Sequence, residues 1–350
     1  MTEVTAMKTK LVTMEAIKEA GEIIRAGELV AFPTETVYGL GADAMNSEAA
    51  AKIYAAKGRP SDNPLIVHIA DMEQVDMVAK EVPEAARKIM EAFWPGPLTV
   101  ILNKKECVPD GTTGGLKTVA VRMPSHPGAQ ALIRESGRVI AAPSANTSGR
   151  PSPTTAQHVL EDMDGKIPMI LDGGPVGIGI ESTIVDMTGE VPMILRPGYI
   201  TKAMLESVVG TVQVDPAVSG KQMPEHVVAK APGMKYRHYA PKGQLTLVEG
   251  DPEKVVDKIN QMALEKEKEG YRVGIIGTDE TIGRYHAGIC RSIGSRKDPD
   301  SVAANLYSIL RECDALELDY MYSESFFEQG LGNAIMNRML KAAGYHLITV

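Results

Sequence analysis

Residues 33–68 read PTETVYGLGADAMNSEAAAKIYAAKGRPSDNPLIVH, and this stretch guides the interpretation of the whole chain. Two loops rich in glycine and small polar residues enclose one short helical segment, with apolar residues before and after. Their polar side chains are Thr34, Thr36, Tyr38, Lys57, Arg59, Asn63 and His68. Hydroxyls, an amide and fixed cations at the ends of apolar strands predict a polyanion site. The alternative is that Lys57 and Arg59 form a solvated helix end, as most such residues do.

The composition indicates an ordinary two-domain globular protein. The chain has 350 residues, of which 44% are hydrophobic and 23% charged, and this length suggests more than one domain. The formal net charge of −8 argues against tight, nonspecific binding of nucleic acid by the whole surface. It leaves room for a local basic cleft.

Cysteine usage and the N-terminus bear on the compartment. Cys107, Cys290 and Cys313 have no paired spacing, which excludes a disulfide framework and a cysteine zinc site. Unpaired cysteines are typical of a reducing compartment. No apolar signal core and no run of about 18 apolar residues occurs, so we expect a soluble, cytoplasmic protein without a membrane partner.

Periodicity predicts an α/β protein. Predicted helices cover 14–27, 47–56, 83–94, 128–135, 155–162, 252–268, 299–313 and 333–343, with Ser47 as the N-cap of the second. Predicted strands cover 29–32, 65–69, 98–102, 119–123, 139–142, 169–171, 183–187, 193–196, 245–248, 273–276 and 289–293. The pair at 183–196 is a hairpin, which predicts mixed rather than strictly parallel pairing. We expect a catalytic domain over 1–212, a linker or lid over 213–242, and a smaller α/β domain over 243–350.

Three further segments collect anion-binding side chains. Arg122 ends a strand before a proline, where it can hold a carboxylate or form a surface ion pair. Residues 141–152 form a loop of small and hydroxyl residues that lets backbone N–H groups approach a phosphate. Residues 172–186 combine four glycines with Ser182 and Thr183, and Arg196 follows at another strand end.

Several familiar chemistries lack their motifs. The sequence has no P-loop GxxxxGK[ST], no GxGxxG after a strand, no GxSxG around Ser144 and no HExxH. His68, on an apolar strand, is by itself most simply a core histidine. Asp43, Asp172 and Asp186 are weak candidates for positioning magnesium, and a metal held mainly by substrate phosphates would leave little trace in the sequence.

Six segments in order resemble one family. They are PTETVYGLG, KIYAAKGRPSDNPLIVH, WPGPLT at 94–99, VAVRMP, APSANTSGRPSPT and GGPVGIGIESTIVD, and the later PGMKYRHYAP adds a seventh. Together they resemble the YrdC-like threonylcarbamoyl-AMP synthase family in its long, two-domain form. The resemblance implies an open, twisted, mixed sheet around a basic concave cleft, followed by a smaller Rossmann-like α/β C-terminal domain.

The resemblance also implies an activity. The family makes L-threonylcarbamoyladenylate and pyrophosphate from L-threonine, bicarbonate and ATP, and a tRNA threonylcarbamoyl transferase complex then uses the product to modify tRNA. Contact with tRNA would therefore be indirect. Magnesium would arrive with ATP, held mainly by its phosphates, with no metal site and no organic cofactor of the protein's own. No step needs a protein nucleophile, so positioning and charge stabilisation can supply most of the acceleration.

Site residues carry over position by position. The positions that match the threonine pocket are Thr36, His68, Arg122, Ala142 and Ser182. Those that match the ATP site are Arg59, Asn63, Thr118, Ser144, Ser152, Arg196 and Tyr236. Lys57 and Arg59 would stabilise phosphate charge during catalysis. The linker that carries Tyr236 and Arg237 is the candidate lid over a product that is labile in water.

Two other functions are alternatives for this sequence. One is a noncatalytic double-stranded RNA-binding module, which the net charge and the scarcity of aromatic residues disfavour. The other is a carbamoyltransferase of the hydrogenase-maturation type, whose zinc-finger cysteine pairs are missing from this sequence. The role of the C-terminal domain stays open between gating the cleft, docking a partner and stabilising the lid.

Overall fold

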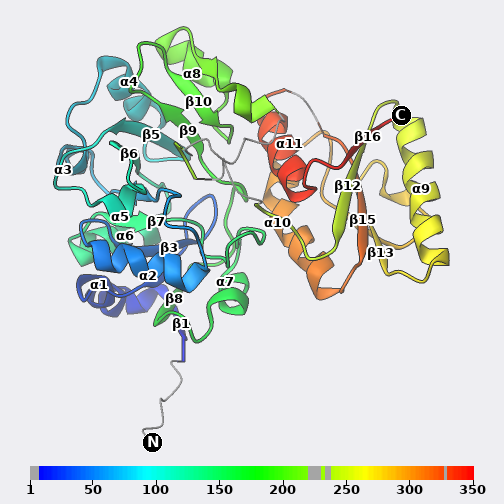
Figure 1. The fold of residues 1–350 in the computed structure, drawn as a ribbon, viewed down its shortest axis with the longest axis horizontal. Helices are drawn as coiled ribbons and strands as arrows, with labels where there is room; N and C mark the ends of the chain where they lie inside the picture. The colour runs from blue at the N-terminus through cyan, green and yellow to red at the C-terminus, as the bar shows by residue number, and fades with distance from the viewer. Residues whose placement is uncertain (1–7, 220–229, 233–237, 327–328) are drawn as a thin grey trace, which may run out of the picture.

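The computed structural model describes residues 8–219, 230–232, 238–326 and 329–350. Figure 1 shows two α/β units side by side, the first drawn from blue to green and the second from yellow to red. The first is built on an 11-stranded sheet and the second on a five-stranded sheet. The prediction of a mixed α/β unit followed by a smaller α/β unit is therefore confirmed.

The first sheet mixes parallel and antiparallel pairs, in the spatial order β1-β8-β2-β3-β7-β4-β6-β5-β9-β10-β11. Its strands are β1 Lys10–Thr13, β2 Val30–Phe32, β3 Gly39–Asp43, β4 Ile66–His68, β5 Leu98–Asn103, β6 Thr118–Arg122, β7 Ile140–Ala142, β8 Met169–Asp172, β9 Thr183–Asp186, β10 Met193–Arg196 and β11 Gln213–Val214. Strands β4 and β6 run parallel with His68 opposite Arg122. Two polar side chains thus end neighbouring parallel strands, and β9 and β10 form the predicted antiparallel pair.

Helices flank this sheet, and several begin at side-chain caps. They are α1 Ile17–Arg25, α2 Ser47–Lys57, α3 Val75–Val78, α4 Glu84–Phe93, α5 Asp110–Thr113, α6 Pro127–Ser136, α7 Ala156–Met163 and α8 Lys202–Val209. The prediction that Ser47 caps α2 is wrong. The side chain of Asn46 accepts from the backbone N–H groups of Glu48 and Ala49 instead, because the cap lies outside the first helical residue.

The second unit is a parallel sheet with helices on both faces. Its elements are β12 Gln244–Glu249, α9 Pro252–Lys268, β13 Val273–Gly277, β14 Ile289–Ser292, α10 Pro299–Ala315, β15 Tyr320–Glu324, α11 Leu331–Ala342 and β16 Leu347–Thr349. The strand order is β14-β13-β15-β12-β16, and every pair is parallel. Alternate residues face opposite sides: Val248 packs in the cluster of α9, whereas Leu247 packs with α10 and α11.

Helices α10 and α11 face the first unit (Figure 1). Val37 and Ile180 of the first unit are buried in the same apolar cluster as these two helices. The approach is close at Gly179, where an added Cβ would lie 2.4 Å from the carbonyl oxygen of Ala303 in α10. The second unit is thus packed directly against loops 33–38 and 176–182 of the first.

Strands β1, β3, β11, β15 and β16 were not predicted. Gly39 and Gly41 made β3 resemble a loop, but the ring of Phe32 covers this strand, and a Cβ at Gly41 would lie 2.8 Å from it. In β15 the polar Ser323 and Glu324 are buried, which hid the strand from a pattern based on apolar residues. Strand β11 lies inside the segment predicted as a linker, and the domain boundaries at 212 and 242 stay a prediction.

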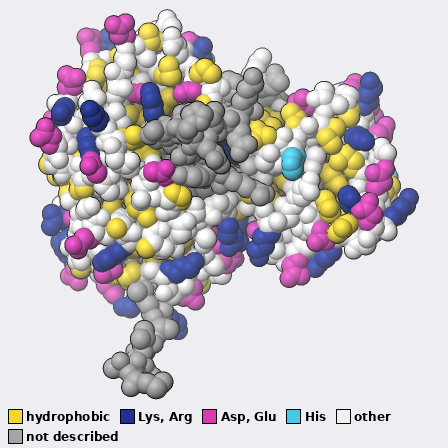
Figure 2. Space-filling model, viewed as in Figure 1, with side chains coloured by type: hydrophobic (Ala, Val, Ile, Leu, Met, Phe, Trp, Pro, Cys, Tyr) yellow, Lys and Arg dark blue, Asp and Glu magenta, His cyan; other side chains and the backbone are white. Residues whose placement is uncertain are grey.

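Charges of both signs cover both units. On the face shown in Figure 2, basic and acidic side chains are interspersed over the coloured part of the surface. In the described part of the chain, no helix is long and apolar enough to cross a membrane.

Candidate active site

A cavity lies where strand ends of the first unit meet the last residues before the second unit. It is lined by Thr34, Thr36, Val37, Gly39, Arg59, Ile66, His68, Arg122, Ala142, Pro143, Ser144, Glu181, Ser182, Arg196, Pro232, His238 and Tyr239. Strands β4, β6, β7 and β10 each contribute their last residue. Ligand sites in α/β sheets commonly occur at such strand ends.

Backbone hydrogen bonds join the loops around the cavity into one wall. The N–H of Ala145 donates to the carbonyl of Tyr38 at 2.8 Å. On the other side, the N–H of Ile178 donates to the carbonyl of Glu35, also at 2.8 Å. The 33–38 loop therefore holds loops 143–154 and 176–182 in fixed positions relative to each other.

All five predicted threonine-pocket residues line this cavity: Thr36, His68, Arg122, Ala142 and Ser182. Arg122 is the centre of the polar contacts among them. Its Nη1 donates to Thr36 Oγ1 at 2.8 Å, and its Nη2 lies 2.8 Å from Glu35 Oε1. Burial raises the pKa of Glu35, but the charge of Arg122 outweighs it and the pKa ends below its ordinary value. Glu35 is therefore ionised and balances the buried guanidinium.

His68 is held as a neutral imidazole. Its Nδ1 lies 3.0 Å from the carbonyl oxygen of Ile66. A carbonyl only accepts, so Nδ1 carries the proton and Nε2 is left as an acceptor. Burial, with the positive charge of Arg122, lowers the pKa of His68 to about 3.

The shifted pKa of His68 predicts a stability that depends on pH. Because the folded pKa is below the unfolded value of about 6.5, the unfolded chain binds more protons between the two values and stability falls as the pH falls. From pH 7.5 to pH 5 we expect His68 alone to remove about 2 kcal/mol of unfolding free energy. Urea denaturation at both pH values measures this. His68→Gln should flatten the dependence and the exposed His346→Gln should not; equal slopes in all three proteins would contradict the assignment.

Ser182 and Arg196 form the next part of the wall. Arg196 Nε donates to the carbonyl of Ser182 at 3.0 Å and its Nη2 donates to Ser182 Oγ at 3.1 Å. Thr99 Oγ1 lies 2.8 Å from the same hydroxyl. Strand β10 thus fixes the side chain that ends the 176–182 loop, and the buried Arg196 lines the cavity from this position.

Of the predicted ATP residues, Arg59, Ser144 and Arg196 line the cavity. Arg59 Nη2 donates to the carbonyls of Asn63 and Pro64 at 3.3 and 3.2 Å. Arg59 Nε and Asn63 Oδ1 are buried, and neither has a hydrogen-bond partner among the described residues. Buried polar atoms are normally satisfied, so these two atoms keep hydrogen-bonding capacity that the described residues do not use.

Lys57 lies behind the cavity rather than on its surface. Its side chain is buried, and its Nζ donates to the carbonyl oxygens of Ser144, at 2.5 Å, and Asn146. Burial, aided by the charge of Arg59, lowers its pKa well below the ordinary value. In this arrangement Lys57 holds the 144–146 loop in place.

Three other predicted ATP residues, Asn63, Thr118 and Ser152, are not among the residues that line the cavity. Ser152 is buried and donates to Glu181 Oε1 at 2.6 Å. Thr118 begins β6, at the opposite end from Arg122. Tyr236, like its neighbour Arg237, lies outside the described residues, although His238 and Tyr239 of the same segment line the cavity. The basic concave character of the cleft stays a prediction.

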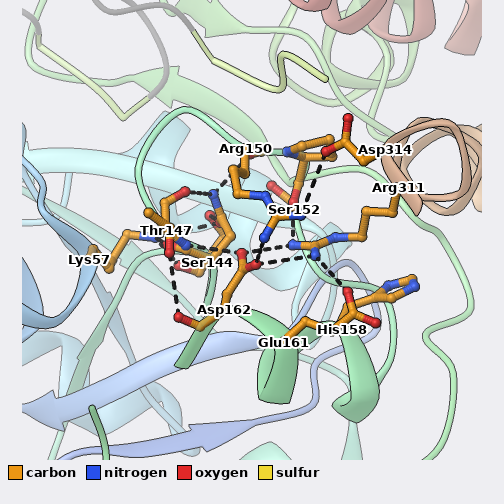
Figure 3. A network of polar contacts seen from close by, with 12 residues as sticks. Lys57, Ser144, Thr147, Arg150, Ser152, His158, Glu161, Asp162, Arg311 and Asp314 are labelled. Atoms are coloured by element: carbon orange, nitrogen blue, oxygen red, sulfur yellow. Dashed lines mark hydrogen bonds and ion pairs between the residues drawn. The ribbon is translucent and has the colours of Figure 1, made fainter. Parts of the chain in front are cut away.

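A second polar network supports the 144–152 loop from below (Figure 3). Its centre is Asp162 of α7, whose side chain is fully buried. Asp162 Oδ1 pairs with Arg150, and Oδ2 accepts from the N–H of Thr147 and from Arg311 Nη2 of α10, both at 3.0 Å. The network joins the cavity loop to the second unit, since Arg311 Nη2 also donates to the carbonyl of Pro151 at 2.7 Å.

The described residues contain no group of three or more histidine, cysteine or acidic side chains placed to hold a metal ion. The expectation that magnesium arrives with ATP, held mainly by its phosphates, stays a prediction.

Comparison with known proteins identifies the family. A family model described as "Telomere recombination" matches residues 22–198, and the model for the threonylcarbamoyl-AMP synthase C-terminal domain matches 200–344. A threonylcarbamoyl-AMP synthase of Bacillus subtilis is 51% identical over 95% of this chain and 94% of its own. The chain belongs to the threonylcarbamoyl-AMP synthase family, in its two-domain Sua5 form.

Other members are similar over the whole length. The synthase of Schizosaccharomyces pombe is 39% identical over 95% of this chain and 89% of its own. The crystal structure of Pyrococcus abyssi Sua5 complexed with L-threonine has a TM-score of 0.92 and 48% identity, and covers 98% of this chain and 100% of that one. The family resemblance inferred from the sequence is thus confirmed over both units of this chain.

Sequence reasoning missed the carboxylates of the site. Glu35 stands between two predicted threonines, Glu181 precedes Ser182, and Asp162 ends a predicted helix. In the sequence each resembles an ordinary acidic residue, because an arginine with which it pairs is distant in the chain. The only local signal was that Glu35 and Glu181 lie inside family motifs.

Proposed function

We propose that this chain makes L-threonylcarbamoyladenylate and pyrophosphate from L-threonine, bicarbonate and ATP. One observation carries the proposal: five residues from separate segments, matched to the threonine pocket by family resemblance, line a single cavity. Three of the ATP-matched residues line the same cavity, so the two substrates would meet there. Membership of the synthase family supports the reaction.

The threonine would bind around Arg122. The guanidinium, already aligned by Thr36 and Glu35, would take the carboxylate of the substrate through paired hydrogen bonds. His68 Nε2, an acceptor in the neutral imidazole, would receive a hydrogen bond from the amine. Keeping the histidine neutral avoids a second positive charge beside an amine that must lose its proton before it can attack.

Two bond-forming steps follow. The threonine nitrogen attacks the carbon of bicarbonate, a C–N bond forms and the elements of water leave, which gives a carbamate. A carbamate oxygen then attacks the α-phosphorus of ATP, an O–P bond forms and pyrophosphate leaves. Arg59 and Arg196 would stabilise the phosphate charge that develops. Asn63, Thr118, Ser144, Ser152 and Tyr236 would complete the ATP site. Lys57 would fix the 144–146 loop, and positioning would supply most of the acceleration.

The linker would close the site. Pro232, His238 and Tyr239 line the cavity, and the N–H of Ala240 donates to the carbonyl of Gly149 at 2.9 Å. These contacts support the proposal that the 213–242 segment acts as a lid that opens for substrates. A closed cavity protects the labile carbamate from water.

The product would serve a tRNA threonylcarbamoyl transferase complex, so we propose indirect contact with tRNA. We also propose a cytoplasmic location, supported by the three free cysteines, which are typical of a reducing compartment.

The test is pyrophosphate release by the pure protein with Mg-ATP, bicarbonate and pyrophosphatase. We expect phosphate production that requires threonine, with little when serine or valine replaces it. Binding of double-stranded RNA without any turnover would contradict the proposal and favour the RNA-binding module.

A further inference from the structure

Glu181 brings a negative charge to the wall of a cavity that is proposed to bind ATP. Among the described lining residues it is the one carboxylate, beside the cations Arg59, Arg122 and Arg196. An unpaired carboxylate in a low-dielectric site repels phosphate strongly. Something must therefore compensate Glu181. Among the described residues of the first unit, its side-chain hydrogen-bond partner is the hydroxyl of Ser152, and Arg196 acts on it through its charge.

The second unit supplies the compensation. Arg338 of α11 is fully buried and its Nε donates to Glu181 Oε2 at 2.8 Å. Its Nη2 also donates to the backbone carbonyl of Glu181 at 3.3 Å. Tyr307 of α10 adds its hydroxyl, 3.0 and 2.8 Å from the two carboxylate oxygens. The carboxylate is thus held mainly by residues more than a hundred positions away in the sequence.

The packing around this pair leaves little freedom. Ile180, next to Glu181, is fully buried in the cluster of α10 and α11. Gly179 touches the backbone of α10, with no room for a Cβ. The rings of Tyr239, in the cavity wall, and Tyr307 have centroids 5.3 Å apart. The guanidinium of Arg338 lies 5.8 Å from the centroid of the Tyr239 ring. One buried cluster therefore contains the carboxylate, the lid residue and two helices of the second unit.

We propose that Arg338 is a positioning residue of the active site. By pairing with Glu181 it neutralises the negative charge that Glu181 brings to the ATP cavity, and it holds Ser152 and Ser182 in place. This inference gives the C-terminal domain a role, and it rests on the proposed function because ATP is the ligand that Glu181 would repel. Burial alone would raise the pKa of Glu181, but Arg338 and then Arg196 lower it to about 2, so the compensated group is an anion.

The experiment compares full-length variants in the pyrophosphate assay and in a titration with Mg-ATP that needs no turnover. Arg338→Met should raise the KM and Kd for ATP by about tenfold or more, because truncating one partner of a buried charge pair leaves the other charge uncompensated. The double variant Arg338→Met with Glu181→Gln should bring both constants back to within about threefold of the wild type, because it no longer carries the uncompensated negative charge. Arg338→Lys should keep most of the affinity.

The matched control is Ser308→Ala, which removes the 2.9 Å hydrogen bond between Ser308 and Thr154 across the same interface and should leave both constants unchanged. A double variant as weak as Arg338→Met would overturn the proposal and leave Arg338 a packing residue. If Arg338→Met fails to fold, Arg338→Lys is compared with the double variant Arg338→Lys with Glu181→Gln. Weaker ATP binding in Arg338→Lys that the second substitution does not relieve would overturn the proposal. A wild type that binds ATP but releases no pyrophosphate would contradict the proposed function, and the titration would still test Arg338.

Discussion

Arg122→Met is expected to lower kcat/KM for threonine by about 100-fold or more, since a buried, charge-assisted pair of this kind contributes several kcal/mol to binding. Arg122 is 4% exposed and ends β6 opposite His68 of β4. The loss should appear mainly as a higher KM for threonine, with a smaller effect on the KM for ATP. Steady-state pyrophosphate release at varied threonine and at varied ATP measures both.

Two companions make this result specific. Arg122→Lys keeps the charge but loses the planar fork, so an intermediate loss is expected. Arg87→Met changes an exposed arginine of α4 and should behave as the wild type. A folded Arg122→Met protein with an unchanged KM for threonine would remove Arg122 from the substrate site.

Asp162→Asn should destabilise the protein by about 3 to 5 kcal/mol, the range found when one partner of a buried ion pair is removed. The fully buried carboxylate pairs with Arg150 and Arg311 and accepts from the N–H of Thr147 (Figure 3). The amide removes the buried anion that the two guanidinium groups share. Each keeps only a longer ion pair, Arg150 with Asp314 at 3.6 Å and Arg311 with Glu161 at 3.5 Å. Urea denaturation followed by circular dichroism measures the loss.

A second substitution separates charge from packing in this network. Asp162→Asn with Arg311→Met removes one of the two cations that lose Asp162 as their partner, so the double variant should regain part of the stability lost by Asp162→Asn. Asp257→Asn on the exposed face of α9 is the matched control, with an expected change near zero. If Asp162→Asn and Asp257→Asn unfold at the same urea concentration, the network does not stabilise the fold.

The sequence predicted those elements whose local residue pattern agrees with the way they pack in the tertiary structure. Helix α9 was predicted with the bounds that the structure has, because its charged face and apolar stripe repeat at helical spacing and Pro252 starts it. Strand β3 was not predicted because its glycines resemble a loop. They are needed for the close contact with the ring of Phe32, which comes from a different strand. The N-cap of α2 was missed by a single residue, which decides between Asn46 and Ser47.

The candidate site shows the same division. Motifs pointed to Thr36, His68, Arg122, Ala142 and Ser182, which the fold brings to one cavity. Glu181 and Arg338 lie 157 residues apart, and no local pattern relates them. Their pairing depends on how α11 packs against the 176–182 loop, which only the tertiary structure supplies.

The central claim is the synthesis of threonylcarbamoyl-AMP, and following labelled carbon tests it most directly. The pure protein would be incubated with Mg-ATP, L-threonine and ¹³C-bicarbonate, and the quenched mixture analysed by mass spectrometry. We predict an adenylate whose mass corresponds to threonylcarbamoyl-AMP with the ¹³C label in its carbamoyl group, formed only when threonine is present. AMP without a labelled adduct, or no consumption of ATP, would contradict the account.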